Sequence, residues 1–422
     1  MRMLDLLKHI DKANVTLTGD LEFVNDWQYF TEDPSAHFEQ LTSTGPFAGT
    51  LGAFTTGVKL RTRYNHLLPA ANTTTTLWAS DSNRVIDTAR YFSAGFFGLP
   101  PTSNTPADLK IIPETANLGA DTLTPGDTCA LYLSDTDFGH DYGAAQLSRF
   151  RSTYLPAISA RLARQNPHVN LTFSDSEIYS MQEMCGFETT VRGSSPWCAL
   201  FSRHEWSSFE YARDVIHYYR AGPGNRYGAA MGWLWLNATA GLLDAGPRRR
   251  HDDDDDAEGL GALFFSFVHD GDIIPMLAAL DLFPDAAHLP TTHVARERKW
   301  RTSQVVPMGG RVIFERLLCS SPSSPSLSPS TSSSSSTSST LLSSTSNHPS
   351  DPKEEEKRDI YIRININDGI VPLPGCTAGP GRSCPLAGFL EHVKRRGEEV
   401  GDFRTVCGLG PDAPDRITFL HQ

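Results

Sequence analysis

The chain has 422 residues, of which 39% are hydrophobic and 10% aromatic, and its formal net charge is -12 at pH 7. This composition is typical of a folded protein with a large core and two or three domains, because disordered chains contain fewer apolar and aromatic residues. The negative charge argues against a nucleic-acid or anionic-membrane partner. No apolar run reaches the roughly 18 residues that a membrane-spanning helix needs, and no signal peptide is recognisable after Met1.

A first strand-to-helix junction is predicted near residue 80. Residues 74–79 are rich in threonine and apolar side chains, which is typical of a strand, and Ser80, Asp81 and Ser82 are good N-cap residues. The apolar residues that follow recur at helical spacing as far as Gly98. Arg84 therefore falls in the first turn of a helix, where free backbone donors and the helix dipole attract anions. We expect Arg84 to be an anion ligand; a plain surface arginine is the alternative.

Residues 119–246 are mostly helical in pattern and predict a smaller helical domain inserted into an α/β chain. Within this segment, apolar residues between positions 147 and 162 share one helical face. Pro156 interrupts that face, and we expect it to kink the helix.

A second strand-to-helix junction is predicted around His269 and Asp270. The nearly continuous apolar run 264–268 is typical of a strand buried on both faces, and the apolar residues from Ile273 to Leu280 mark a helix. Ligands in open α/β sheets bind at the carboxyl ends of strands. We therefore expect His269 and Asp270 to form a site for an anion and a proton donor. The alternative is that His269 is packed and that Asp270 only caps the helix.

Two segments are predicted to lie outside the core. Residues 320–358 are rich in serine, proline and charge, which predicts a disordered insertion between two alternating strands near 312–316 and 360–366. The aspartate run 252–256 lacks the spacing of a calcium loop, so we expect a solvated loop rather than a metal site.

The cysteines and sequons suit a secreted glycoprotein. Seven cysteines are present without a C-x-x-C pair, and the close spacings 185–198 and 376–384 are typical of small disulfide loops. The odd count leaves one thiol without a partner. Four N-glycosylation sequons begin at Asn14, Asn72, Asn170 and Asn237.

Taken in order, several segments resemble the fungal secreted acid phosphatases and phytases of the histidine acid phosphatase family. The resemblance runs from about Leu21 to Cys407 outside the serine-rich insertion. It is carried by residues 80–98, 184–189, 196–201, 221–225, 267–270, 306–310 and 375–385. It implies an α/β fold in which helices flank a mostly parallel sheet, with residues 1–118 and 247–422 in the α/β domain and residues 119–246 in the inserted all-α domain.

The resemblance also implies a chemistry. Family members hydrolyse phosphomonoesters through a phosphohistidine intermediate, with arginines around the phosphoryl oxygens and an aspartate that protonates the leaving alcohol. By matching, Asp270 is the proton donor, His269 is a catalytic phosphate contact and Arg84 is a phosphate ligand. The implied substrate is a small phosphomonoester, with phytate among the candidates, and no metal or organic cofactor is expected. The implied location is extracellular or in the cell wall, and the oligomeric state stays open.

The family pattern further implies three disulfides, Cys129–Cys407, Cys185–Cys198 and Cys376–Cys384, which leave Cys319 as the free thiol.

One departure from the family is large. The family's nucleophile lies in an R-H-G-x-R-x-P segment, which this sequence does not contain. Arg203–His204 and Arg250–His251 are look-alikes that match no catalytic position. The departure predicts a truncated gene model; the alternatives are a non-catalytic phosphate-binding descendant and a secreted glycoprotein module.

Overall fold

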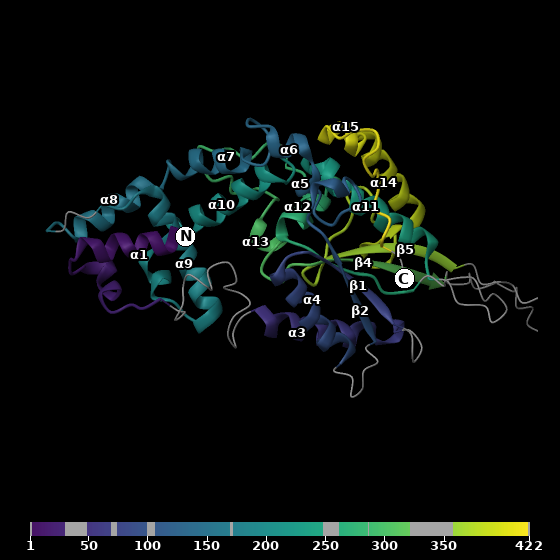
Figure 1. Ribbon diagram of the computed structural model, residues 1–422, viewed down its shortest axis with the longest axis horizontal. Coiled ribbons are helices and arrows are strands. Elements are labelled where there is room, and N and C mark those ends of the chain that lie inside the picture. Colours follow the sequence, from purple (N-terminus) through teal and green to yellow (C-terminus); the bar gives the residue numbers. More distant parts are fainter. Residues whose placement is uncertain are drawn as a thin grey trace, which may run out of the picture.

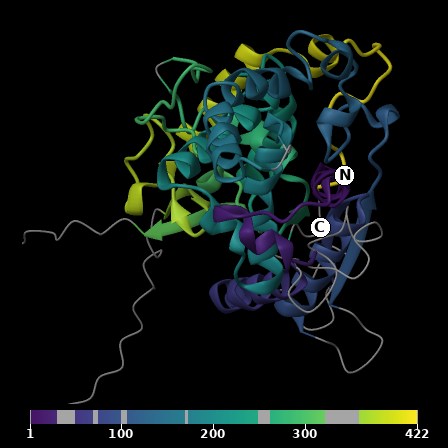
Figure 2. The same cartoon turned by 90° about the vertical axis from the view of Figure 1, so that its left-hand side faces the viewer.

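The computed structural model describes residues 2–29, 49–68, 74–98, 106–168, 172–247, 261–285, 287–320 and 358–420. Two small sheets lie in one half of the molecule, and a group of helices extends to the opposite end, which carries α1 (Arg2–Ala13) and α8 (Leu155–Gln165) (Figure 1). The view turned by 90° looks onto that end (Figure 2). The aspartate run, the interior of the serine-rich insertion and the sequons at Asn72 and Asn170 lie outside the described residues.

The first sheet is parallel and has the strand order β2-β1-β3. Its strands are β1 (Thr75–Ser80), β2 (Ala107–Ile112) and β3 (Phe265–Phe267). Helix α4 (Asn83–Phe97) follows β1 and packs its apolar face, which includes Phe92 and Phe96, against the aromatic side chains of β3. The predicted strand and helix around Arg84 are thus both present.

Helix α3 (Gly49–Tyr64) packs closely on α4 at a pair of glycines. A Cβ atom on Gly57 would lie 2.2 Å from the carbonyl oxygen of Phe92, and one on Gly95 would lie 2.1 Å from that of Phe54. Glycine is required at both positions because the two backbones meet there.

Strand β3 differs from the prediction. The apolar run was expected to form a strand over residues 264–268 that is buried on both faces, whereas the structure has a three-residue strand whose residues are all half-buried. Among the described residues β3 is an edge strand that pairs with β1 alone. It therefore lacks a neighbouring strand on its other edge, whereas the strands of parallel sheets are usually enclosed.

The second sheet is antiparallel. Strands β4 (Val312–Ser320) and β5 (Arg358–Ile366) pair over their full length, and the short strands β6 (Gly369–Ile370) and β7 (Cys384–Pro385) complete it. These are the two alternating strands that the sequence predicted on either side of the serine-rich insertion. The prediction of a parallel sheet flanked by helices holds for the first sheet.

Residues 119–246 form helices, as predicted. The bounds are α5 (Pro125–Thr128), α6 (Ala130–Ser134), α7 (Tyr142–Arg151), α8, α9 (Asp175–Arg192), α10 (Arg203–Arg220) and α11 (Gly228–Ala245). Capping boxes built by Ser174 with Glu177 and by Ser202 with Glu205 start α9 and α10. Later helices are α12 (Asp270–Leu280), α13 (Thr302–Val305), α14 (Leu386–Val400) and α15 (Phe403–Cys407), and short 3-10 turns are η1 (Gly19–Asn25), η3 (Asn65–Leu67), η4 (Ala116–Leu118), η5 (Pro196–Leu200) and η6 (Pro380–Arg382).

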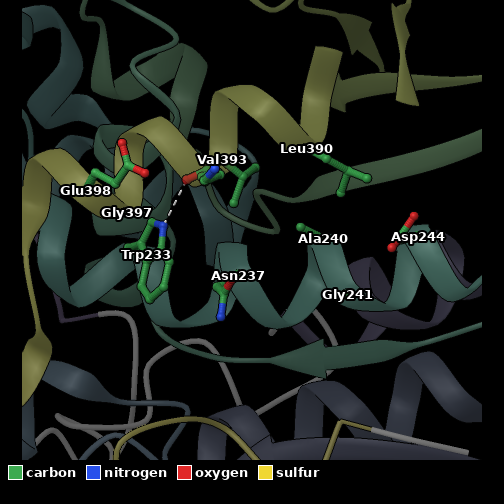
Figure 3. A pocket seen from close by; sticks show the side chains of 10 residues that line it. Trp233, Asn237, Ala240, Gly241, Asp244, Leu390, Val393, Gly397 and Glu398 are labelled. Atoms are coloured by element: carbon green, nitrogen blue, oxygen red, sulfur yellow. Dashed lines mark hydrogen bonds between the residues drawn. The ribbon is translucent and has the colours of Figure 1, made fainter. Parts of the chain in front are cut away.

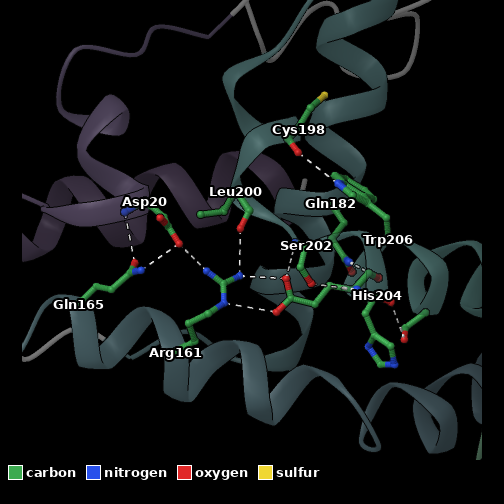
Figure 4. A network of polar contacts seen from close by, with 11 residues as sticks. Asp20, Arg161, Gln165, Gln182, Cys198, Leu200, Ser202, His204 and Trp206 are labelled. Atoms are coloured by element: carbon green, nitrogen blue, oxygen red, sulfur yellow. Dashed lines mark hydrogen bonds and ion pairs between the residues drawn. The ribbon is translucent and has the colours of Figure 1, made fainter.

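The N-terminal segment packs on these helices, although the predicted division placed residues 1–118 in the α/β part. Helix α1 contacts α9, and η1 contacts α8 and η5. Arg161 of α8 is the main polar link: it donates to Asp20 at 2.6 Å, to Glu205 at 3.1 Å and to the carbonyl oxygen of Leu200 at 2.9 Å (Figure 4). The hydrogen bonds of Arg161 thus connect η1, α8, η5 and the start of α10.

The largest hydrophobic core also crosses the predicted boundary. It contains Leu6 of α1, Leu162 of α8 and Leu236 of α11 together with Ile364 of β5 and Phe389 of α14. The helical segment therefore shares its core with the C-terminal part of the chain.

The structure contains the three disulfides that the resemblance implies. Cys129 pairs with Cys407 across 278 residues, and the bonds Cys185–Cys198 and Cys376–Cys384 close short loops. Cys319 on β4 is free.

Candidate active site

The two predicted strand-to-helix junctions lie side by side. Strands β1 and β3 are parallel neighbours, with Ala79 opposite Phe267, so the two strands end at the same edge of the sheet. Arg84 is the second residue of α4, and His269 is the N-cap residue of α12. Arg84 Nη2 lies 3.3 Å from His269 Nδ1. The sheet thus brings together the two residues that the sequence marked separately as anion ligands.

The third parallel strand contributes Glu114, which the sequence reasoning missed. Glu114 lies two residues beyond the end of β2, and its Oε1 atom lies 3.1 Å from His269 Nε2. Both side chains are mostly buried, with exposed fractions of 25% for Glu114 and 22% for His269. The signal that could have found Glu114 is a carboxylate directly after a strand, but β2 itself was not predicted.

Asp270 begins helix α12 and is exposed. Its Oδ1 atom accepts a hydrogen bond of 2.8 Å from the backbone N–H of Gly271. Asp270 directly follows His269 in the chain and is open to solvent. The hydrogen bond from Gly271 fits the alternative prediction, in which Asp270 caps the helix, because Gly271 lies in the first turn of α12. The backbone N–H of the N-cap residue is bonded by a different carboxylate.

That carboxylate is Asp272, whose Oδ2 atom accepts the backbone N–H of His269 at 3.2 Å. Burial raises the pKa of Asp272 well above its ordinary value, and the charges of Asp127, Glu114 and Asp270 raise it further. Asp272 thus stabilises the start of α12 through its hydrogen bond with the N-cap residue.

Helix α10 carries a basic pair near Asp270. Arg213 Nη2 donates to His217 Nε2 at 3.0 Å, and His217 is buried. Burial and then the charge of Arg213 lower the pKa of His217 to about 4, whereas the charge of Asp270 acts in the opposite direction. Asp270 therefore interacts electrostatically with the buried, neutral His217 and with Arg213, whose side chain is 36% exposed.

The look-alike His204 lies in the first turn of α10, and Figure 4 shows it among the residues around Arg161. Arg203 starts the same helix, and Arg250–His251 lies outside the described residues.

Two of the predicted sequons lie within the described residues. Asn14 is exposed just after α1, and Asn237 is exposed on α11.

A separate groove of about 580 Å³ runs between α11 and α14 (Figure 3). Trp233, Asn237 and Glu398 are among the residues that line it, and the Trp233 indole N–H donates to the carbonyl oxygen of Val393 at 3.1 Å. Its lining includes none of Arg84, Glu114, His269 and Asp270. It is therefore distinct from the site at the sheet edge.

Within the part of the chain that the structure describes, no three histidine, cysteine, aspartate or glutamate side chains are grouped to hold a metal ion. In the same part, no helix is long and apolar enough to cross a membrane.

Comparison with known proteins identifies the class. The model of the histidine phosphatase superfamily (branch 2) matches residues 3–340. Phytase PHO112 of Candida albicans is 33% identical over 409 residues, which are 96% of this chain and 76% of that protein. Acid phosphatase PHO1 of Komagataella pastoris is 31% identical over 414 residues, which are 96% of this chain and 75% of that protein.

A solved structure agrees. The crystal structure of the phytase from D. castellii superposes with a TM-score of 0.78 at 26% identity, covering 99% of this chain and 79% of that one. The chain belongs to branch 2 of the histidine phosphatase superfamily. By family it is a phosphomonoester hydrolase of the acid phosphatase and phytase type, so the resemblance drawn from the sequence is confirmed.

Proposed function

We propose that Arg84 and His269 bind the phosphoryl group of a small phosphomonoester. The supporting observation is that the two side chains, carried by neighbouring parallel strands, lie 3.3 Å apart at the carboxyl edge of the sheet. An arginine fork and an imidazole are suited to phosphate oxygens, and the N-terminus of α12 adds backbone donors at the same edge. The relatives named as phytase and acid phosphatase make phytate one candidate substrate.

Asp270 is the proposed proton donor to the leaving alcohol. An alkoxide is a poor leaving group, so its departure from phosphorus needs a proton from a group at hand. Asp270 is exposed and directly follows His269, whereas Asp272 accepts the backbone N–H of His269 and Glu114 is paired with the His269 ring. The exposure of Asp270 to solvent, directly after His269, is compatible with contact to the ester oxygen of a bound substrate.

The nucleophile of the proposed phosphohistidine chemistry is not among these residues. His269 is held between Arg84 and Glu114, in the position of a phosphate ligand. The R-H-G-x-R-x-P segment is absent from the 422 residues. Loss of a nucleophile that acts together with its neighbours typically costs about a millionfold in turnover. We therefore expect residues 1–422 by themselves to bind phosphate without hydrolysing its esters.

The disulfides support an oxidising location such as the extracellular space or the cell wall. Three disulfides are rare in proteins of the reducing cytosol and common in secreted ones. The exposed sequons at Asn14 and Asn237 are compatible with glycosylation on that route.

The test is to express residues 1–422, confirm folding by circular dichroism, and measure both phosphate binding and hydrolysis of p-nitrophenyl phosphate at acid pH. We expect binding of inorganic phosphate and no hydrolysis above the buffer rate. The variant Asp270→Asn should keep its phosphate affinity, because Asp270 is assigned to the alcohol. A turnover of about 1 per second or more, which is ordinary for an enzyme, would show that another residue acts as nucleophile.

A further inference from the structure

His269 is contacted by a different side chain at each of its ring nitrogens. Arg84 Nη2 lies 3.3 Å from Nδ1, and Glu114 Oε1 lies 3.1 Å from Nε2. The three residues follow β1, β2 and β3, so the order of the parallel strands places the histidine between the arginine and the glutamate. The two contacts together determine which nitrogen carries the proton.

A guanidinium has five N–H donors and no acceptor. The contact from Arg84 is therefore a hydrogen bond only if Nδ1 accepts, which leaves Nδ1 without a proton. A carboxylate is an acceptor, so its contact with Nε2 requires an N–H on that nitrogen. Both contacts select the same tautomer, in which Nε2–H points to Glu114 and Nδ1 faces Arg84.

We propose that Glu114 is a positioning residue that keeps a proton on Nε2 of His269 and so reserves Nδ1 for the bound phosphoryl group. This inference rests on the proposed phosphate site and adds to it a residue outside the motifs that carry the family resemblance. A phosphoryl oxygen that arrives between Arg84 and His269 meets Nδ1. Because Glu114 holds the proton on Nε2, Nδ1 becomes a donor by taking up a second proton from the buffer, and His269 then binds as a cation.

The negative charge of Glu114 has a defined role in this arrangement. A carboxylate close to a phosphate site would repel the ligand if it were unpaired. Here it is paired with the histidine, and it stabilises the imidazolium that forms when phosphate arrives, in the same way that a carboxylate orients and supports the histidine of other catalytic sites. The carboxyl of Asp272 contacts the backbone N–H of His269, whereas Glu114 contacts its ring.

The first test uses the protein without phosphate. The nitrogen-15 chemical shifts of histidine rings distinguish protonated from unprotonated nitrogens, and the signals of His269 are assigned with His269→Asn. We expect Nε2 to be protonated and Nδ1 unprotonated at pH 7 in the wild type and also in Arg84→Ala, where Glu114 alone holds the proton. In Arg84→Ala/Glu114→Ala we expect a mixture of tautomers. Retention of the wild-type tautomer in the double variant, or its loss in Arg84→Ala, would overturn the proposal.

The second test adds inorganic phosphate. Glu114→Gln keeps an acceptor for Nε2–H and removes the charge, so the tautomer should persist while phosphate affinity falls by about tenfold or more, the range expected for loss of a charged hydrogen-bond partner. Asp108→Asn is the matched control, because Asp108 lies on β2 and pairs with Lys110 rather than with His269. Phosphate should protonate both nitrogens of His269 in the wild type and in Asp108→Asn, and Glu114→Gln should stay singly protonated.

Equal phosphate affinities in Glu114→Gln and Asp108→Asn would overturn the role of the charge. If the wild type does not bind phosphate at all, the proposed phosphate site fails, and the first test still decides whether Glu114 sets the tautomer of His269.

Discussion

Arg84 Nη2 lies 3.3 Å from His269 Nδ1, although 185 residues separate them in the sequence. The contact arises because β1 and β3 are adjacent and parallel, so that a residue just after one strand meets a residue just after the other. Neither residue is strained or fully buried, and each is fixed by the start of its own helix. A site of this kind depends on the sheet order rather than on a local motif.

The ion pair between Asp214 and Arg298 should be important for stability. Their side chains are 0% and 3% exposed, and Arg298 Nε donates to Asp214 Oδ2 at 2.5 Å. We expect Arg298→Met to lower the free energy of unfolding by about 3–5 kcal/mol, because it leaves a buried carboxylate without its partner. Urea denaturation followed by circular dichroism measures this change.

The matched control for Arg298 is Arg395→Ala on α14. Arg395 pairs with Glu399 at 2.8 Å, but the two side chains are 55% and 43% exposed. An exposed pair of this kind contributes less than about 1 kcal/mol. Equal losses in the two variants would show that burial does not set the strength of the Asp214–Arg298 pair.

His217 should make the folded protein sensitive to acid. Burial lowers its pKa from 6.5 to about 4, so the unfolded chain takes up this proton first as the pH falls. The free energy of unfolding should therefore decrease between about pH 6.5 and pH 4, by about 3 kcal/mol from this group. His217→Gln keeps an acceptor for Arg213 and cannot be protonated, so its stability should fall less over the same window.

The comparison of the two pH curves isolates His217. Burial also raises the pKa of Asp214 to about 6, which affects stability in the opposite direction, but this contribution is common to the wild type and His217→Gln. Parallel curves for the two proteins would mean that His217 is accessible to protons in the folded state.

Two glycines of α11 should respond oppositely to alanine. A Cβ atom on Gly232 would lie 2.0 Å from the carbonyl group of Pro275 in α12, whereas one on Gly241 would meet nothing within 4 Å. We expect Gly232→Ala to destabilise the protein by about 1–3 kcal/mol through overpacking. Gly241→Ala should stabilise it by about 0.5–1 kcal/mol, because alanine has the better helix propensity. Thermal melting of the two variants checks the sign; a neutral Gly232→Ala would contradict the close contact of α11 with α12.

One thiol should be free. Cys319 is the cysteine that lies outside the three disulfides. Titration of the denatured, unreduced chain with a thiol reagent should find one thiol in the wild type and none in Cys319→Ser. Three or more thiols in the wild type would contradict the pairing.

The sequence predicted the parts of the fold that depend on local pattern. The helical face after Ser82 and the helix after Asp270 are both present, because apolar residues at spacings of three and four bury one side of a helix whatever the rest of the chain does. Pro156 was expected to kink one helix. It instead lies in the first turn of α8, after α7 has ended at Arg151, which is where proline costs least.

The parts that the sequence did not predict depend on contacts between distant segments. Glu114 follows a strand of mixed polarity that has no clear alternation, so nothing local marked it as a neighbour of His269. The docking of α1 and η1 on the helical segment depends on Arg161 and Asp20, which are 141 residues apart. Contacts between residues so far apart in the sequence cannot be predicted from local sequence patterns.

The most direct test of the proposed site is calorimetric titration of residues 1–422 with inorganic phosphate, in the wild type, in Arg84→Ala and in Arg90→Ala. Arg90 is the matched control, since it also lies on α4 but is exposed and pairs with Asp87 on its own helix. We predict that Arg84→Ala weakens phosphate binding by about tenfold or more, the loss expected for a charged hydrogen bond, and that Arg90→Ala leaves it unchanged. Equal affinities in all three proteins, or no binding by the wild type, would contradict a phosphate site built on Arg84 and His269.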